Sequence, residues 1–382
     1  MACEVRREDM ERKGIVAAGH ICLDITPKFQ NKKEEPIGKL LVPGHLLAMG
    51  AADVHVGGSV ANTGLGLKIL GADVSLMGKV GRDAFGELVR MQLAGYQADE
   101  GMIVSKGEDT SYSIVVAPPG TDRIFLHHSG ANDSFSCEDL DYGLVEKAQL
   151  FHFGYPPLMR RMYEDQGEEL TEMFRRVHAA GCATSLDMAA VDEDSPAGEA
   201  DWREILERVL PYVDFFVPSV EELAYMTDRK RYEEWMERAG GEDVTRILRA
   251  EEDIRPLAEQ LIEMGAKVVL IKCGAPGMYL ASGNQEAVRQ IGGGLGECMD
   301  GWKELRHFEA SYRPEQVLSG TGAGDTSIAA FLYAVTKGYT WDRCLRLAAA
   351  TGASCVEAYD ALSGLRSFEE LERKISGGWA KV

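Results

Sequence analysis

Ser319-Gly320-Thr321-Gly322-Ala323-Gly324-Asp325-Thr326 is the stretch that decides the fold. It lies between a strand predicted over residues 316–318 and an apolar run, residues 327–335, that predicts a helix. Closely spaced glycines let the backbone turn tightly and expose consecutive N–H groups, and at a helix N-terminus such groups bind anions. Asp325 would be a poor phosphate ligand because like charges repel, but it suits a base that removes a proton from a hydroxyl group. The alternative is a plain glycine turn with Asp325 as an ordinary helix N-cap.

A second glycine-rich stretch stands near the N-terminus, Gly57-Gly58-Ser59-Val60-Ala61-Asn62-Thr63-Gly64, and it begins a predicted helix over residues 59–70. Residues 78–86, Gly-Lys-Val-Gly-Arg-Asp-Ala-Phe-Gly, follow it. Together with the first octet, these motifs resemble the ribokinase-like (PfkB) carbohydrate kinase family in order and spacing, over most of the chain. The resemblance implies a single kinase domain over residues 1–382, with an α/β fold: a three-layer α/β/α sandwich with a mainly parallel central sheet and a small β-sheet lid.

The composition of the chain limits which partners are possible. The chain has 382 residues, is 45% hydrophobic and carries a net charge of −20, which argues against nucleic acid as a partner because phosphate backbones need clustered Lys and Arg. No apolar run approaches the ~20 residues of a membrane span, and residues 1–13 lack the apolar core of a signal peptide. The eight cysteines include no Cys-x-x-Cys pair. These features favour a reduced, cytoplasmic protein with no structural metal site.

Apolar strands alternate with amphipathic helices, which by itself predicts an α/β sandwich. The predicted central strands are residues 14–19, 74–77, 148–154, 183–187, 215–217 and 267–272. The lid is expected from residues 26–56 and 109–128, and residues 285–311 are expected to be mostly loop. Exposed lid strands leave open edges that need covering, so a homodimer that pairs lid on lid is expected, as in relatives.

The resemblance implies a sugar site around the first strand and the second glycine motif. Asp24 stands just past a strand, at the sheet edge where open α/β folds bind ligands. The family pattern implies that Asp24, Gly58 and Asn62 contact the sugar hydroxyls. A surface Asp that caps a turn is the alternative for Asp24.

The resemblance also implies sites for ATP and Mg²⁺, with a monovalent cation such as K⁺ as a further candidate. The turn Gly274 to Gly277 would lie along the ATP, together with Thr321, Gly322 and Gly324. Glu222 would organise water around Mg²⁺, which keeps most of its waters when bound; a solvated glutamate at a helix start is the alternative. The family usually has Asn where Ser219 stands, and Asp where Ser319 stands.

The motifs of other nucleotide-binding and hydrolase classes, namely Walker A, Gly-x-Gly-x-x-Gly and Gly-x-Ser-x-Gly, are absent. The leading interpretation is an ATP-dependent sugar kinase that transfers the γ-phosphate to a primary hydroxyl of a small carbohydrate. Asp325 would be the general base, and the N–H groups of Gly322, Ala323 and Gly324 would stabilise the transferred phosphoryl group.

Two alternatives stay open. One is a nucleoside kinase of the same superfamily, whose base-stacking pocket would use Phe151, Phe153, Tyr155 and Met159. The other is a sugar- or nucleotide-binding homologue without catalysis, which Ser219 and Ser319 would fit and which the retention of Asp325 opposes.

Overall fold

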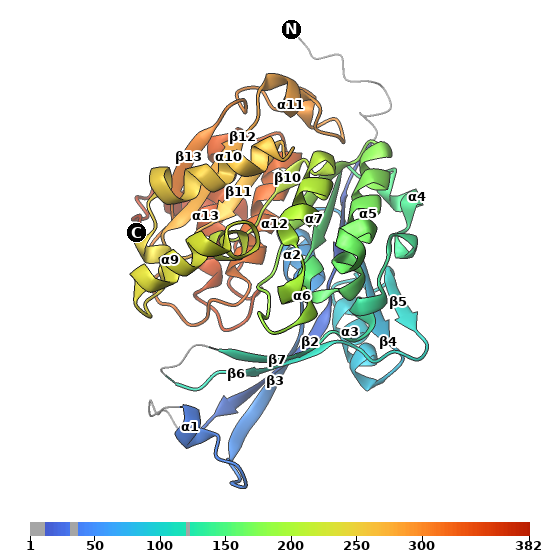
Figure 1. Cartoon of the computed structure of the whole chain (residues 1–382), viewed down its shortest axis with the longest axis vertical. Helices are drawn as coiled ribbons and strands as arrows, with labels where there is room; N and C mark the ends of the chain where they lie inside the picture. Colours follow the sequence, from blue (N-terminus) through green and yellow to red (C-terminus); the bar gives the residue numbers. More distant parts are fainter. Residues whose placement is uncertain (1–11, 31–36, 120–122) are drawn as a thin grey trace.

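The computed structural model describes residues 12–30, 37–119 and 123–382, and in this part nine strands form one large sheet, sheet A (Figure 1). Their order is β13-β12-β11-β10-β9-β8-β1-β4-β5. The strands from β11 through β5 pair in parallel, and β12 and β13 are antiparallel additions at one edge. The strand bounds are β1 (Ile15–Gly19), β4 (Val74–Gly81), β5 (Met102–Ser105), β8 (Leu150–Gly154), β9 (Ala183–Asp187), β10 (Phe215–Phe216), β11 (Val268–Lys272), β12 (Gly277–Ser282) and β13 (Arg306–Ala310).

Helices cover both faces of sheet A because its strands are apolar on both sides, as in other buried parallel sheets. In β1, Ile15 and Ala17 belong to one apolar cluster, whereas Val16 and Ala18 belong to another. The first cluster includes α2 (Ser59–Ile69), α3 (Ala84–Ala94), α12 (Ala323–Thr336), α13 (Trp341–Cys355) and α14 (Phe368–Ser376). The second includes α5 (Glu168–Ala179), α7 (Trp202–Val209), α8 (Val220–Thr227), α9 (Arg229–Ala239) and α10 (Arg255–Glu263). The predicted three-layer sandwich is confirmed.

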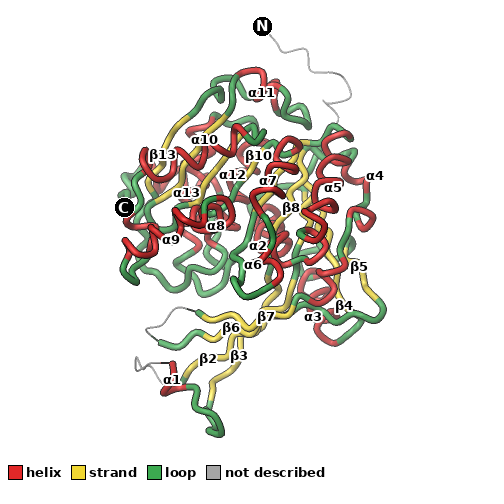
Figure 2. The backbone as a smooth tube through the Cα atoms, viewed as in Figure 1, coloured by secondary structure: helices red, strands yellow, loops and turns green. Residues whose placement is uncertain are grey.

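A smaller sheet, sheet B, projects from one end of the sandwich (Figure 2). Its order is β3 (Met49–Gly57), β2 (Cys22–Phe29), β6 (Tyr112–Val116) and β7 (Ile124–His128). The two segments predicted to form a lid supply these strands, although β2 begins earlier, at Cys22. Residues 31–36 and 120–122 of those segments, and most of the stretch on which the expectation about a signal peptide rests, lie outside the described residues.

Short helices complete the described chain: α1 (Ile37–Leu40), α4 (Tyr142–Val145), α6 (Pro196–Glu199) and α11 (Gln285–Arg289). Within the described ranges, no helix is both long and apolar enough to cross a lipid bilayer.

One local prediction near the C-terminal edge of sheet A was wrong, and another missed a strand. Residues 316–318 form no strand; they are a loop in which the Leu318 N–H donates to the Val356 carbonyl over 2.8 Å. The strand lies earlier, as β13, in the region expected to be loop. Its sequence, Arg-His-Phe-Glu-Ala, has no apolar run because β13 is an edge strand and all five residues are partly exposed.

Candidate active site

Polar side chains gather at the edge of sheet A where its parallel strands end. His20 follows β1, Tyr155 comes directly after β8, and Asp187 and Lys272 are the last residues of β9 and β11. Ligands bind at this edge in open α/β sheets. The N-terminus of α12 reaches the same place, since Asp325 in its first turn is hydrogen-bonded to Tyr155.

The glycine octet forms the start of α12. Gly322 is the N-cap residue, with a left-handed φ of 71°, and a side chain there would collide with Ala361. Only glycine takes this position without strain. The first N–H groups of a helix have no acceptor within it, and the Ala323 N–H makes a long bond of 3.4 Å to the Gly320 carbonyl. Gly322, Ala323 and Gly324 therefore form a helix N-terminus of the kind that binds anions.

Asp325 is buried, with 5% of its surface exposed, and three side chains from distant segments hold its carboxylate. The Tyr155 hydroxyl donates to both oxygens, over 2.7 and 2.9 Å. Asn62 Nδ2 donates to Oδ2 over 3.0 Å, and Thr63 Oγ1 lies 3.4 Å from Oδ1. Burial raises the pKa of Asp325, while the charge of Lys272 and the bonds from Tyr155 and Asn62 lower it in part. The group is a carboxylate with increased basicity in a site shielded from water.

The residues predicted to contact a sugar lie beside Asp325. Asn62 bonds it directly. Asp24, on β2, accepts a hydrogen bond from the Cys22 thiol over 3.3 Å. Burial raises the pKa of Asp24, and the charge of Asp325 also raises it. Gly58 precedes α2 with a φ of 82°, and a Cβ there would lie 2.7 Å from His20 Nδ1. That buried nitrogen has no hydrogen-bond partner within the described part of the chain.

The residues predicted to contact ATP lie near the same edge. The turn from Gly274 to Gly277 begins just after Lys272, with the Gly277 N–H 3.3 Å from the Gly274 carbonyl. Thr321 lies in the glycine octet, where its Oγ1 accepts from Ser319 Oγ over 2.9 Å. The guanidinium of Arg123, beside β7 of sheet B, also donates to Thr321 Oγ1. The segment that leads into β7 of sheet B therefore contacts the glycine octet.

Glu222 lies in the first turn of α8 and closes a capping box with Ser219. Its Oε2 accepts from the Ser219 N–H over 3.0 Å, and Ser219 is the N-cap residue. Ser-x-x-Glu is the sequence that forms such a box, which gives Ser219 a structural role at a position where the family usually has Asn. In the ranges that the structure describes, the other oxygen, Oε1, has no hydrogen bond to the protein.

Lys272 and Asp187 form an ion pair that sequence reasoning missed, as it missed His20 and the contact of Tyr155 with Asp325. Lys272 Nζ donates to Asp187 Oδ1 over 2.7 Å. Burial raises the pKa of Asp187 to about 8, although the Lys272 charge lowers it. Burial lowers the pKa of Lys272, but three carboxylates, Asp187, Glu222 and Asp325, raise it more. The sequence offered one signal for these residues, namely their position. Each of them is the last residue of a predicted parallel strand or follows such a strand.

The base-stacking pocket suggested for a nucleoside is contradicted. Phe151, Phe153 and Met159 have no exposed surface and pack in the apolar cluster under α5 and α7. Tyr155 bonds Asp325 instead of offering a free aromatic face beside them. Side chains alternate along β8, and both of its phenylalanines face the core helices.

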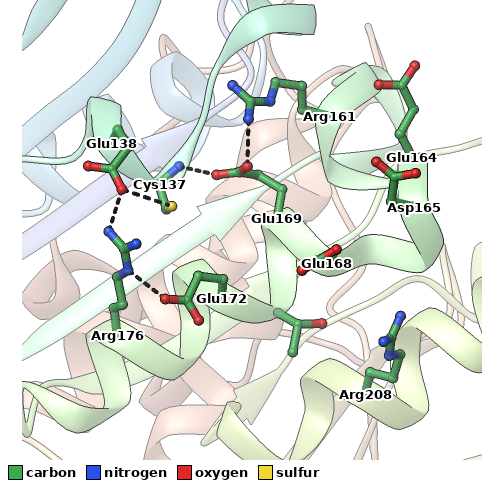
Figure 3. A pocket seen from close by; sticks show the side chains of 11 residues that line it. Cys137, Glu138, Arg161, Glu164, Asp165, Glu168, Glu169, Glu172, Arg176 and Arg208 are labelled. Carbon is green, nitrogen blue, oxygen red and sulfur yellow. Dashed lines mark hydrogen bonds and ion pairs between the residues drawn. The ribbon is translucent and has the colours of Figure 1, made fainter.

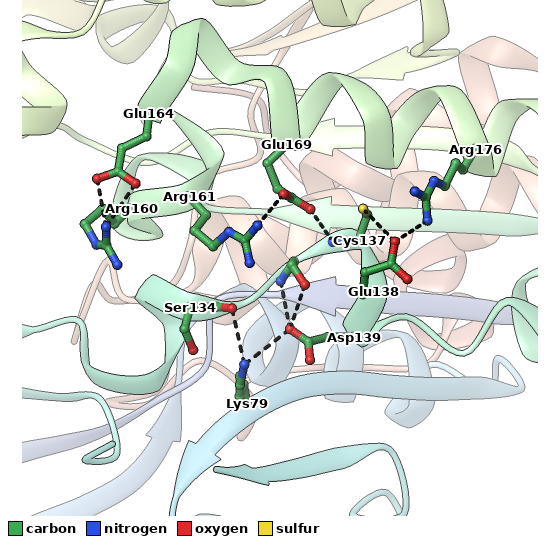
Figure 4. Close-up of polar contacts among 11 residues, drawn as sticks. Lys79, Ser134, Cys137, Glu138, Asp139, Arg160, Arg161, Glu164, Glu169 and Arg176 are labelled. Atoms are coloured by element: carbon green, nitrogen blue, oxygen red, sulfur yellow. Dashed lines mark hydrogen bonds and ion pairs between the residues drawn. The ribbon is translucent and has the colours of Figure 1, made fainter. Parts of the chain in front are cut away.

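A separate pocket of about 530 Å³ opens over the start of α5 (Figure 3), and none of its lining residues belongs to the Asp325 cluster. Some of its charges pair with one another: Arg161 with Glu169 over 2.8 Å, and Arg176 with Glu138 over 2.6 Å. Figure 4 shows the neighbouring contact of Lys79 Nζ with the Ser134 carbonyl, over 3.2 Å. The Arg176–Glu138 pair fastens the segment before α4 to α5, and the other two contacts join neighbouring segments, so we assign them a structural role.

Comparison with known proteins agrees with this geometry. Residues 39–367 match the model of the pfkB family carbohydrate kinases. An uncharacterized sugar kinase of Archaeoglobus fulgidus is 26% identical over 306 residues, which are 79% of this chain and 98% of that protein. A 5-dehydro-2-deoxygluconokinase of Shouchella clausii is 22% identical over 94% of this chain and 95% of its own.

Solved structures share the fold. The Arabidopsis thaliana ribokinase complexed with ribose and ATP aligns with a TM-score of 0.67 and 20% identity, over 95% of this chain and 98% of that one. A fructokinase with bound ATP from Xylella fastidiosa aligns with a TM-score of 0.67 and 21% identity, over 95% and 98%. The family match covers most of the chain and includes both glycine motifs. The protein therefore belongs to the PfkB family of carbohydrate kinases and is a sugar kinase.

Proposed function

We propose that this kinase transfers the γ-phosphate of ATP to a primary hydroxyl group of a small carbohydrate, with Asp325 as the general base. The observation that carries the proposal is the position of Asp325. It is a buried, basic carboxylate within one residue of an anion-binding helix N-terminus, and it is held by Asn62 from the second glycine motif.

Asp325 takes the proton of the sugar hydroxyl as its oxygen attacks the γ-phosphorus, and the bond to the leaving ADP oxygen breaks on the opposite side. The N–H groups of Gly322, Ala323 and Gly324 stabilise the charge on the transferred phosphoryl oxygens. Such reactions depend chiefly on positioning and on electrostatic stabilisation. Asn62 and Tyr155 orient the carboxylate through the bonds described above.

The sugar lies, in this proposal, against Asp24, Gly58 and Asn62. Gly58 packs against His20 more closely than a side chain would allow, so glycine lets the start of α2 reach the site. The carboxyl of Asp24 accepts hydrogen bonds from ring hydroxyls, and its burial makes such bonds strong. Gly274, Gly277 and Thr321 contact the ATP, and sheet B closes over the sugar as a lid.

The residues present fit Mg²⁺ as the ion that accompanies ATP. Mg²⁺ prefers hard oxygen donors and keeps several waters, and Asp187 Oδ2 is a buried oxygen without a partner among the described residues. No three His, Cys, Asp or Glu side chains of the described ranges form a cage for a metal ion, so Glu222 would hold Mg²⁺ through water. When bound, the ion neutralises phosphate charge.

The proposal includes a homodimer that pairs sheet B of one copy with sheet B of the other. All five residues of β7 are exposed, and Phe125 and Leu126 each expose 54% of their surface. Exposed apolar strands at a sheet edge are usually covered in soluble proteins.

The test of the proposed function is ADP formation from Mg-ATP with pentoses, hexoses, ketoses and nucleosides as acceptors. We expect ADP formation with at least one sugar. No nucleoside should be used with a kcat/KM comparable to that of this sugar. A signal with nucleosides alone would contradict the proposal.

A further inference from the structure

Two buried Lys–Asp pairs lie at opposite ends of β11. They differ in how many of their polar atoms have hydrogen-bond partners in the protein. Lys267, just before the strand, pairs with Asp214, and its Nζ also lies 3.4 Å from the Gln290 carbonyl. Asp214 Oδ2 accepts from the Thr184 and Gly292 N–H groups, over 3.0 and 3.2 Å. This pair is closed, because both carboxylate oxygens have protein partners.

The pair at the other end, Lys272 with Asp187, is open. Asp187 Oδ2 has no partner in the ranges that the structure describes, although Asp187 is fully buried. The Lys272 ammonium has three N–H donors, and its one protein partner among the described residues is Asp187 Oδ1. The Lys272 side chain retains 14% exposure, so the protein does not enclose it completely. The N–H donors of Lys272 that have no partner among the described residues indicate a site for an anionic ligand.

The Lys272 side chain crosses from β11 to the glycine octet. A Cβ on Gly324 would lie 3.4 Å from Lys272 Cδ and 3.7 Å from Nζ. The Lys272 side chain therefore lies close beside the first turn of α12. A cation at the positive end of a helix is unfavourable by itself; the arrangement becomes favourable when an anion lies between the ammonium and the helix N–H groups.

We propose that Lys272 is a catalytic residue of this kinase whose ammonium binds an oxygen of the phosphoryl group in transfer, opposite the N–H groups of Gly322–Gly324, with Asp187 as its positioning residue. The inference rests on the proposed function. A bond forms between the sugar oxygen and the γ-phosphorus, the bond to the ADP oxygen breaks, and the proton goes to Asp325. Lys272 stays protonated throughout and contributes charge and hydrogen bonds where the phosphoryl charge develops.

The experiment compares Lys272→Met with Lys267→Met, a matched control that breaks the closed pair on the same strand. Steady-state kinetics with Mg-ATP and the best acceptor give kcat and KM for each protein. Lys272→Met should lower kcat about 10²–10³-fold, the usual loss for a donor to transition-state charge, with little change in the KM of the sugar. Lys267→Met should lower the melting temperature and keep kcat within about threefold of wild type, since it touches no reacting atom.

A second readout separates a phosphoryl contact from a structural role. Aluminium fluoride mimics the phosphoryl group in transfer. In calorimetry, the wild type should bind Mg-ADP more tightly when aluminium fluoride is present than when it is absent. Lys272→Met should lose most of this gain in affinity. Lys272→Arg keeps the charge and should recover part of kcat, and Asp187→Asn should lower kcat less than Lys272→Met. These two variants decide the matter if Lys272→Met does not fold.

The outcomes are distinguishable. Suppose the wild type is active. If the kcat of Lys272→Met is within about threefold of the wild-type value, or if Lys267→Met loses as much kcat as Lys272→Met, the role of Lys272 is overturned. The proposed function would stay intact in both cases. A wild type that forms no ADP with any acceptor would overturn the proposed function, and this inference with it.

Discussion

Asp325 is basic because of what surrounds it. Burial raises its pKa, and the hydrogen bonds of Tyr155 and Asn62, with the charge of Lys272, keep that rise limited. The ideal pKa of a general base lies near the working pH. The balance between burial and these donors therefore sets the pH range in which the carboxylate accepts a proton.

Replacing Tyr155 with Phe should move the acid limb of the kcat/KM profile to higher pH. The Tyr155 hydroxyl stabilises the ionised carboxylate, so its loss raises the Asp325 pKa further, and the base is then protonated at pH values where it is free in wild type. The measurement is kcat/KM against pH for both proteins. An acid limb that stays in place, or moves to lower pH, would show that Tyr155 does not tune this base.

At the scale of single elements, α8 combines a structural task with the chemical task proposed above for Glu222. Ser219 caps the helix, and Glu222 completes the capping box with one oxygen while the other stays available. The two tasks make different demands on the side chain. The cap needs a hydrogen-bond acceptor at position 222, which Gln also supplies, whereas holding the waters of Mg²⁺ depends on charge.

Substitutions in α8 should separate these tasks. Ser219→Ala should lower the free energy of unfolding by about 1 kcal/mol through loss of the cap, with kcat unchanged. Glu222→Gln should keep the stability within about 0.5 kcal/mol and raise the Mg²⁺ concentration that gives half-maximal activity. Chemical denaturation and Mg²⁺ titrations of activity measure the two effects. An unchanged Mg²⁺ requirement in Glu222→Gln would leave Glu222 as a helix cap alone.

The helices and strands also show how much of the fold and of the candidate site the sequence could predict. The continuous apolar strands β1, β9 and β11 were predicted closely, because strands covered on both faces have a clear pattern. The edge strand β13 was missed because half-exposed residues carry no such pattern. Of the site, the glycine motifs indicated Asp325 and Asn62, but the contact of Tyr155 with Asp325 was missed. Tyr155 has a left-handed φ of 69° after β8, a turn that no local motif announces.

At the scale of the whole molecule, the site draws on segments far apart in the chain. Asn62 and Asp325 are separated by 263 positions, and the parallel order of sheet A brings them to one edge. Sheet B adds Arg123 to the same place through its bond to Thr321. The segment that leads into β7 therefore contacts the glycine octet on which the proposed phosphate site is built.

The exposed face of β7 should make the protein a dimer. Phe125→Glu places a charge in the centre of the proposed contact and should shift the protein to monomers, since desolvating an unpaired charge is costly. Light scattering after size-exclusion chromatography gives the mass of both proteins. Met91→Glu, on α3, is a suitable control because Met91 is also exposed, by 63%, but lies outside sheet B. A monomeric wild type at micromolar concentration would contradict the dimer.

The most direct test of the central claim is the kcat of Asp325→Asn with the best acceptor, measured beside calorimetric binding of that sugar and of Mg-ATP. Asn keeps the size of the side chain and removes the basic oxygen. The proposed mechanism predicts a fall in kcat of about 10²-fold or more, with both ligands still bound. A variant that binds both ligands and retains wild-type kcat would contradict the assignment of Asp325 as the base.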